Sequence, residues 1–228
     1  MVPKIVSRHA LLVAFIALLG TTMPAKADII FTTLVGNCCG GEGIAGAFSA
    51  SVAEAFTPAA DYVVTDAQVE VFQNLGFGGD PFFNISLYSN DPIGPGPFIT
   101  PDGVPGALIA NFGTDLMAPN SGGIVVGSGP TPRLTAGTRY WLVLSPFDST
   151  TNVGWEYSPG TSVPLDTIST AQGIWRDLGP GSGLQFQIDG SPVPEPASWV
   201  LLAITLTLLA SHRSKMRIPS ALSDSTKR

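Results

Sequence analysis

The sequence predicts an all-β fold, a β-sandwich with the jelly roll as one form of it. A signal helix is expected before it, and a short transmembrane helix after it. Short segments of alternating apolar and polar residues recur between residues 28 and 190. Clusters of Gly, Pro, Asn and Asp separate them, and no stretch between the two ends keeps a helical apolar period. Only 12% of the residues are charged, which disfavours long helices with charged outer faces.

Four segments carry the clearest strand signals. In residues 62–72 the alternation predicts a core-facing set made of Val63, Thr65, Ala67, Val69 and Val71. Residues 82–88 repeat this period and place together Phe83, Ile85 and Leu87. Residues 139–145 are almost continuously apolar, which predicts a central strand buried on both sides, and residues 184–189 alternate as the last strand. Weaker candidates are residues 29–35, 47–56, 107–112, 123–126, 153–157 and 173–176.

An apolar segment with basic residues in front of it opens the chain. Lys4 and Arg8 precede the apolar residues 10–20, and Ala25 and Ala27 stand at the small-residue positions that signal peptidase requires. The apolar run is short for crossing the roughly 30 Å of membrane hydrocarbon. We therefore expect residues 1–27 to be a secretory signal peptide that signal peptidase removes after Ala27, rather than a membrane anchor.

A second apolar segment closes the chain. It opens with the motif Val193, Pro194, Glu195 and Pro196. The apolar residues 197–210 follow, and a helix over them is about 21 Å long, short for a full span. Behind them comes a basic cluster of Arg213, Lys215 and Arg217. This cluster is expected to stay on the cytoplasmic side, which places residues 28–196 outside the cytoplasmic membrane and makes residues 218–228 a cytoplasmic tail.

The motif, the apolar run and the basic cluster, in this order, resemble the PEP-CTERM sorting signal of bacterial exosortase substrates. The resemblance covers about residues 192–217, and residues 191–217 are expected to form the sorting signal, with its transmembrane helix at residues 197–210. It implies an exosortase as processing partner, membrane anchoring in transit and a final place at the cell surface or in an extracellular polysaccharide matrix. Residues 218–228 depart from the family pattern, in which the chain stops soon after the basic cluster. A plain single-pass membrane anchor is the alternative.

The middle of the chain carries a second resemblance. Residues 134–144 read LTAGTRYWLVL. Three further segments, residues 47–57, 83–89 and 105–108, precede them in this order along the chain. This order resembles the "choice-of-anchor" class of bacterial surface β-domains, over about residues 45–190. The resemblance implies a β-sandwich without a known activity, so residues 28–190 are expected to be one extracellular domain.

Acidic residues dominate the chain between its ends. Residues 28–192 contain fifteen Asp and Glu but only three basic residues, Arg133, Arg139 and Arg176. A surface of this sign repels phosphate backbones, so we expect no nucleic-acid partner. The two histidines, His9 and His212, lie in the terminal segments, which leaves no His-based triad or zinc site between them. We therefore expect a non-enzymatic protein.

Cys38 and Cys39 are adjacent and are the only cysteines of the chain. They lie in the Gly-rich residues 36–43, which we expect to form a flexible loop. A disulfide between neighbouring residues is strained, so intermolecular bridges and free thiols stay open as alternatives. Two thiols are too few for a metal site without ligands from elsewhere.

Acidic and aromatic side chains come together near the end of the predicted domain. Trp155, Glu156 and Tyr157 are consecutive, Trp175 follows, and Asp148, Asp166 and Asp177 lie nearby in sequence. A carbohydrate-binding module, or a glycosidase with two carboxylates, uses such a combination to act on matrix polysaccharide. Core aromatic residues beside solvated acids are the simpler explanation.

Calcium is the one metal for which the loops offer ligands. Residues 74–80 and Asn90-Asp91 have the oxygen-rich composition that calcium prefers, but neither has the spacing of an EF-hand loop. We therefore expect no cofactor and no metal site, with calcium as the alternative.

Overall fold

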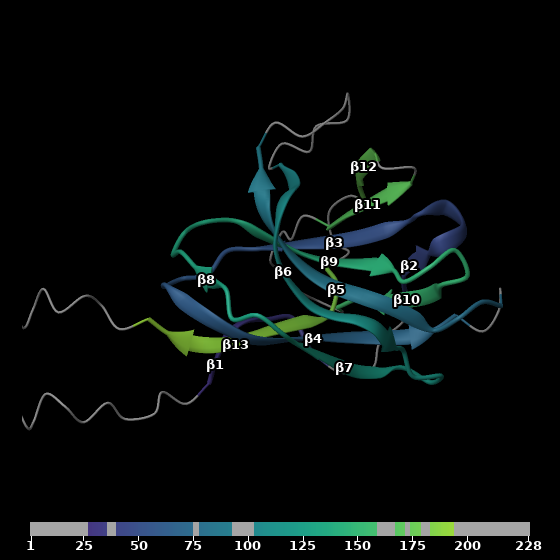
Figure 1. Cartoon of the computed structure of the whole chain (residues 1–228), viewed down its shortest axis with the longest axis horizontal. Coiled ribbons are helices and arrows are strands. Elements are labelled where there is room, and N and C mark those ends of the chain that lie inside the picture. The colour runs from purple at the N-terminus through teal and green to yellow at the C-terminus, as the bar shows by residue number, and fades with distance from the viewer. Residues whose placement is uncertain are drawn as a thin grey trace, which may run out of the picture. The chain divides into compact units, whose positions relative to one another are not determined.

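Thirteen strands in two antiparallel sheets form the part of the chain that the computed structural model describes (Figure 1). The described residues are 27–35, 40–74, 78–92, 103–158, 167–171, 174–178 and 183–193. Within them the only helical element is the 3-10 turn Gly46–Phe48, and no helix is long and apolar enough to cross a membrane. The all-β prediction is therefore confirmed. The helices expected at the two ends of the chain lie outside the described residues.

Sheet A contains seven of the strands. In order across the sheet they are β1 (Asp28–Thr32), β13 (Phe186–Pro192), β4 (Tyr62–Gln73), β10 (Asn152–Glu156) and β2 (Gly41–Ala45). Two further strands also pair with β4, namely β7 (Gly123–Ser128) and β8 (Arg133–Leu134). The twelve-residue strand β4 is therefore the strand around which sheet A is built.

Sheet B contains the other six strands. In order they are β12 (Ile174–Asp177), β11 (Thr167–Ala171), β3 (Ser51–Phe56), β9 (Tyr140–Pro146), β5 (Phe82–Asp91) and β6 (Val104–Met117). β6 is an edge strand, and its register with β5 shifts at four places. Such irregularity keeps an edge from pairing with another chain.

Both sheets contribute side chains to one hydrophobic core. Sheet B supplies the fully buried Phe83, Ile85 and Leu87, the set predicted to share a face. Sheet A supplies the fully buried Val69 and Trp155 among others. Each such side chain stabilises the fold by about 1.5–3 kcal/mol relative to an exposed one.

β9 is buried on both sides, as predicted. Leu142 and Leu144 face the core shared with sheet A. Trp141 and Val143 face the other way and join a second cluster with Ala53, Ala55 and Val104. The second cluster lies on the outer face of sheet B, which we define as the face turned away from the shared core. A continuous apolar run is the pattern that such two-sided burial requires.

The predicted core face of β4 is wrong in its first half. Val63 and Thr65 are only half-buried, whereas Val64 is fully buried. The register between β4 and β13 shifts opposite Asp189 and Gly190, so Thr65 is an extra residue on β4. A bulge of this kind reverses the alternation of all residues on one side of it.

Two segments near the N-terminus also differ from the predictions. Gly41–Ala45 forms strand β2, although its first three residues were expected to belong to a flexible loop. The sequence did not predict this strand because the segment contains two glycines, and Gly is depleted in strands. Ala47 and Phe48, predicted at the start of a strand, instead lie in the 3-10 turn, which ends at Ser49 with a left-handed φ of 49°.

The ends of the folded body lie side by side. β1 pairs with β13 in antiparallel register, with Asp28 opposite Gly190. Strand β13 continues to Pro192, two residues past the predicted domain boundary, and a compact unit of the chain ends at that residue. Figure 1 shows β1 and β13 together at the left-hand end.

Candidate functional site

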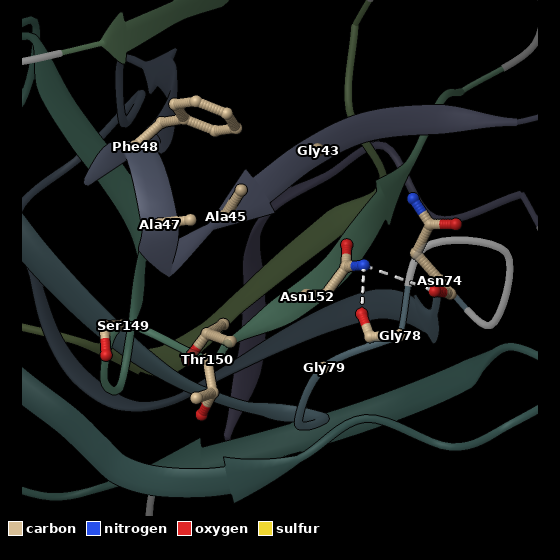
Figure 2. Close-up of a pocket in the computed structure, with 11 residues that line it drawn as sticks. Gly43, Ala45, Ala47, Phe48, Asn74, Gly78, Gly79, Ser149, Thr150 and Asn152 are labelled. Atoms are coloured by element: carbon tan, nitrogen blue, oxygen red, sulfur yellow. Dashed lines mark hydrogen bonds between the residues drawn. The ribbon is translucent and has the colours of Figure 1, made fainter.

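The surface is hollowed at the end of the fold where β2 and β4 stop and β10 begins (Figure 2). The groove has a volume of about 460 Å³. The described residues that line it come from three segments and are Gly43, Ala45, Ala47 and Phe48, then Asn74, Gly78 and Gly79, and then Ser149, Thr150, Thr151 and Asn152. Strand pairing brings them together, because Asn152 of β10 is opposite Ala45 and Val153 is opposite Gln73.

The 3-10 turn after β2 builds the aromatic side of the groove. Ala45 and Ala50 exchange two backbone hydrogen bonds, at 3.3 and 2.9 Å, which close the chain into a tight reversal. Gly46 donates its N–H to the carbonyl of Thr151 at 2.9 Å, and a Cβ at this position would overlap the backbone of the neighbouring loop. The reversal presents Phe48 with 68% of its surface exposed.

The loop between β9 and β10 forms the floor, and hydrogen bonds fix its shape. Asp148 Oδ1 accepts bonds from the hydroxyl of Thr150 at 2.6 Å and from its N–H at 2.8 Å. These bonds hold the pKa of Asp148 below its ordinary value. Thr151 donates its hydroxyl to the carbonyl of Phe82 at 2.8 Å, which ties the loop to the start of β5.

Amide and hydroxyl groups form the remaining side of the groove. Asn152 Nδ2 donates to the carbonyl oxygens of Gly78 at 2.6 Å and Asn74 at 3.4 Å, the two bonds drawn in Figure 2. Its Oδ1 points away from these bonds. The side chains of Asn74 and Ser149 have no hydrogen-bond partner in the described part of the chain. Among its described lining residues the groove therefore combines an exposed aromatic ring with polar groups that have unused donors and acceptors.

No charged side chain is among the described residues that line the groove. The carboxylates of Asp148 and Asp80 both lie within hydrogen-bond distance of the Thr150 hydroxyl, at 2.6 and 2.8 Å, and its single proton bonds to one of them at a time. The groove consequently presents neutral polar groups, although the domain as a whole is strongly acidic.

The structure does not assemble the site expected from Trp155, Glu156, Tyr157 and Trp175. Trp155 is fully buried in the shared core and donates its Nε1–H to the carbonyl of Gln185 at 2.8 Å, so its face cannot reach a polysaccharide. Alternation turns Glu156 to the opposite face of sheet A, where it is 5% exposed. Trp175 belongs to sheet B and packs against the second cluster.

Tyr157 also lies away from the groove lining. Its hydroxyl donates to Glu42 Oε2 at 3.0 Å, and burial together with this bond raises the pKa of the phenol. Trp155 therefore belongs to the core, and Tyr157 packs against it as a partly buried residue.

Two pairs of carboxylates lie on the outer face of sheet A. Glu70 and Glu156 are 3% and 5% exposed, and Oε2 of Glu70 has no hydrogen-bond partner. Burial raises the pKa of Glu70, and the charge of Glu156 raises it further. Burial and the adjacent Asp66 likewise raise the pKa of Asp189, against the hydrogen bonds that Asp189 accepts from two glutamine amides.

A further carboxylate, that of Glu54 in β3, is fully buried, and its neighbours in the strand include the core residues Val52 and Phe56. Its Oε2 accepts a hydrogen bond from the N–H of Leu184 at 3.4 Å. In the described ranges no three His, Cys, Asp or Glu side chains are grouped so that they would hold a metal ion. Of the segment considered for calcium, Asn90 Oδ1 accepts the Nε1–H of Trp141 at 2.8 Å.

The residues expected to act in export lie at or beyond the edges of the described part. Ala27 is the first described residue and Val193 the last. Beyond these two residues lie Ala25, Pro194, Glu195, Pro196, Arg213, Lys215 and Arg217. Cys38 and Cys39, considered for a disulfide, also lie outside the described residues.

Comparisons with known proteins do not assign a family. No protein-family model matches the chain, and no curated protein matches it either. The groove was not found from the sequence, because Phe48, Asn74, Ser149 and Asn152 come from three separate segments. The one local signal was Phe48, which follows a Gly-Ala pair and precedes a polar serine, a poor pattern for a buried strand residue.

Proposed function

We propose that this chain is an exported bacterial surface or matrix protein without enzymatic activity, whose β-sandwich domain is sorted by an exosortase through its C-terminal motif. One observation carries the proposal. The first strand begins at Asp28, the residue after the expected signal-peptidase site, and the last strand ends at Pro192, next to Val193 of the sorting motif. Both signals can therefore be cut without removing a strand. The jelly-roll assignment stays a prediction.

The pairing of β1 with β13 supports the same proposal. It brings both expected processing points to one end of the domain. The groove lies at the other end, because Tyr62 of β4 is opposite Pro192 and Asn74 follows the far end of the strand. Twelve residues of strand span about 35 Å. The groove and the residue that leads into the sorting motif therefore lie at opposite ends of β4.

The position of the carboxylates favours a binding role over the alternative of a glycosidase. Glycosidases need two carboxylates that flank a substrate. Here the pair formed by Glu70 and Glu156 is buried in sheet A. Asp80 and Asp148 both approach the same Thr150 hydroxyl and are not among the described residues that line the groove. A carbohydrate-binding module is therefore the second candidate, and a plain membrane anchor is the third.

Intact-mass measurement of the protein from each compartment of its native host tests the proposal. We expect a surface or matrix species that starts at Asp28 and ends between Val193 and Pro196. Replacement of Glu195 by Ala should leave a membrane species with residues 197–228 attached, whereas Glu42→Ala, a matched change in the domain, should be processed normally. A wild-type protein that keeps residues 197–228 everywhere would contradict sorting by an exosortase.

A further inference from the structure

We propose that the groove, at the end of the domain opposite Pro192, binds a stretch of uncharged polysaccharide, with one sugar ring stacked on Phe48. The proposal deepens the proposed function, on which it rests for the source of the ligand. Ligand sites of about 300–1,000 Å³ that combine apolar walls with a few polar groups are typical of proteins, and the groove, at about 460 Å³, falls within that range.

The exposure of Phe48 is the first argument. A phenylalanine with 68% of its surface in water has lost most of the free energy that burial provides. The tight reversal and the close contact of Gly46 with the neighbouring loop hold it there. The C–H face of a sugar ring is apolar and matches the flat face of an aromatic ring, whose negative charge density attracts C–H groups.

The polar groups that line the same groove are the second argument. A sugar hydroxyl both donates and accepts hydrogen bonds, and an amide or a serine hydroxyl can do the same. Within the described ranges the side chains of Asn74 and Ser149 make no hydrogen bond, and Oδ1 of Asn152 is left over after its Nδ2 has bonded to the loop. Because those two bonds fix the Asn152 amide, little entropy is lost when it binds a ligand.

Charge decides which polysaccharide fits. An anionic polymer needs basic side chains, and none lines the groove among the described residues. Arg133 lies at the opposite end of β4, where it pairs with Asp61 at 2.9 Å. Between residues 28 and 192 acids outnumber bases by fifteen to three, so the domain repels polyanions. An uncharged chain avoids this repulsion.

The open space above Gly43 provides an independent way to close the site. A Cβ built at Gly43 meets no atom within 4 Å, so a larger side chain there projects into the groove without displacing the strand. Gly43→Leu should fill the groove while Phe48→Ala removes its aromatic surface. Phe147→Ala is the matched control, because Phe147 is 46% exposed in the adjacent loop but does not line the groove.

The experiment measures binding by the full chain, purified in a detergent with a polyoxyethylene rather than a sugar head group. The probes are neutral hexasaccharides of glucose, mannose, galactose and xylose, together with dextran and dextran sulfate as a pair that differs only in charge. We expect calorimetry to detect at least one neutral hexasaccharide, and affinity electrophoresis to retard the chain in dextran more than in dextran sulfate if glucose is the unit bound. Phe48→Ala and Gly43→Leu should each weaken binding by about tenfold or more, the equivalent of about 1.4 kcal/mol.

Each other outcome overturns the inference. Binding of no neutral hexasaccharide, preference for dextran sulfate, or equal binding by wild type and both groove variants would do so. Self-association that Phe48→Ala abolishes would show that a second copy of the chain occupies the groove. Melting temperatures of the variants separate loss of binding from loss of folding. Since the assay does not depend on processing, failure of sorting in the host would leave its result unaffected.

Discussion

The outer faces of the two sheets both bury side chains, but the buried side chains differ in chemistry. The outer face of sheet B buries apolar side chains, among them Ala53, Trp141 and Val143. The outer face of sheet A carries the buried Glu70 and Glu156 instead. Apolar burial stabilises the fold at every pH, whereas burial of a carboxyl group disfavours its charged form and makes stability depend on pH. The comparison therefore predicts which changes act through packing and which act through charge.

The largest effect is expected on sheet B. Trp141→Ala removes a fully buried ring and its hydrogen bond to Asn90. We expect a loss of about 3–5 kcal/mol in the free energy of unfolding, measured by urea denaturation and independent of pH between 5 and 8, which is about the range where few side chains titrate. Val126→Ala, at a position 53% exposed on sheet A, should change stability little. A loss for Trp141→Ala as small as that for Val126→Ala would contradict a stabilising core on the outer face of sheet B.

The next effect tests how closely sheet A is packed. Phe72 lies across Gly41 and Gly154, so that a Cβ at Gly154 would overlap its ring. Gly154→Ala should therefore destabilise the domain by about 1–3 kcal/mol. Its cross-strand neighbour Gly43 has open space and serves as the control. Equal melting temperatures for Gly154→Ala and Gly43→Ala would mean that Phe72 does not cover the strand.

A smaller effect, a gain rather than a loss of stability, is expected when Glu70 is replaced. Its pKa is raised above the ordinary value of 4.5, so the folded state holds the proton more tightly than the unfolded state. The stabilisation from this proton is complete below pH 4.5 and is lost as the pH rises through the folded-state pKa. Glu70→Gln should raise Tm at pH 7 by about 2–4 °C and flatten its pH dependence. A lower Tm at pH 7 would contradict it.

The smallest effect is expected at an exposed carboxylate. The N–H of Ala136 and then Arg133 lower the pKa of Asp61, so its contribution to stability is present above the ordinary pKa of 3.8 and is lost as the pH falls through the lowered value. Asp61→Asn should slightly lower Tm at pH 7 and leave it unchanged at pH 2. Added salt should reduce the difference, because exposed ion pairs are screened. A rise in Tm at pH 7 would be inconsistent with this pairing.

The sequence was informative where a strand keeps one period along its length. The strands β5, β9 and β13 were found because apolar residues either alternate or run without interruption through them. The bulge at Thr65 could not be found, since it depends on the partner strand and not on β4 itself. β11 was missed as well, because Thr167–Ala171 has little apolar periodicity.

The candidate site was harder to predict than the fold. Its location depends on the registers that place β10 between β2 and β4, and these registers join residues about a hundred positions apart. The aromatic residues singled out from the sequence were those near acids, yet Trp155 entered the core. Composition identifies residues that are able to bind a sugar, whereas only the fold decides which of them reach the surface.

The antiparallel ladder between β4 and β13 also has a mechanical consequence. If the domain is held at Pro192 and pulled by a polymer in its groove, the force runs along the strands, because the two points lie at opposite ends of β4. The hydrogen bonds of the ladder from Phe186 to Pro192 are then loaded together in shear, and they do not break one after another. The same domain pulled from its β6 edge would be peeled one bond at a time.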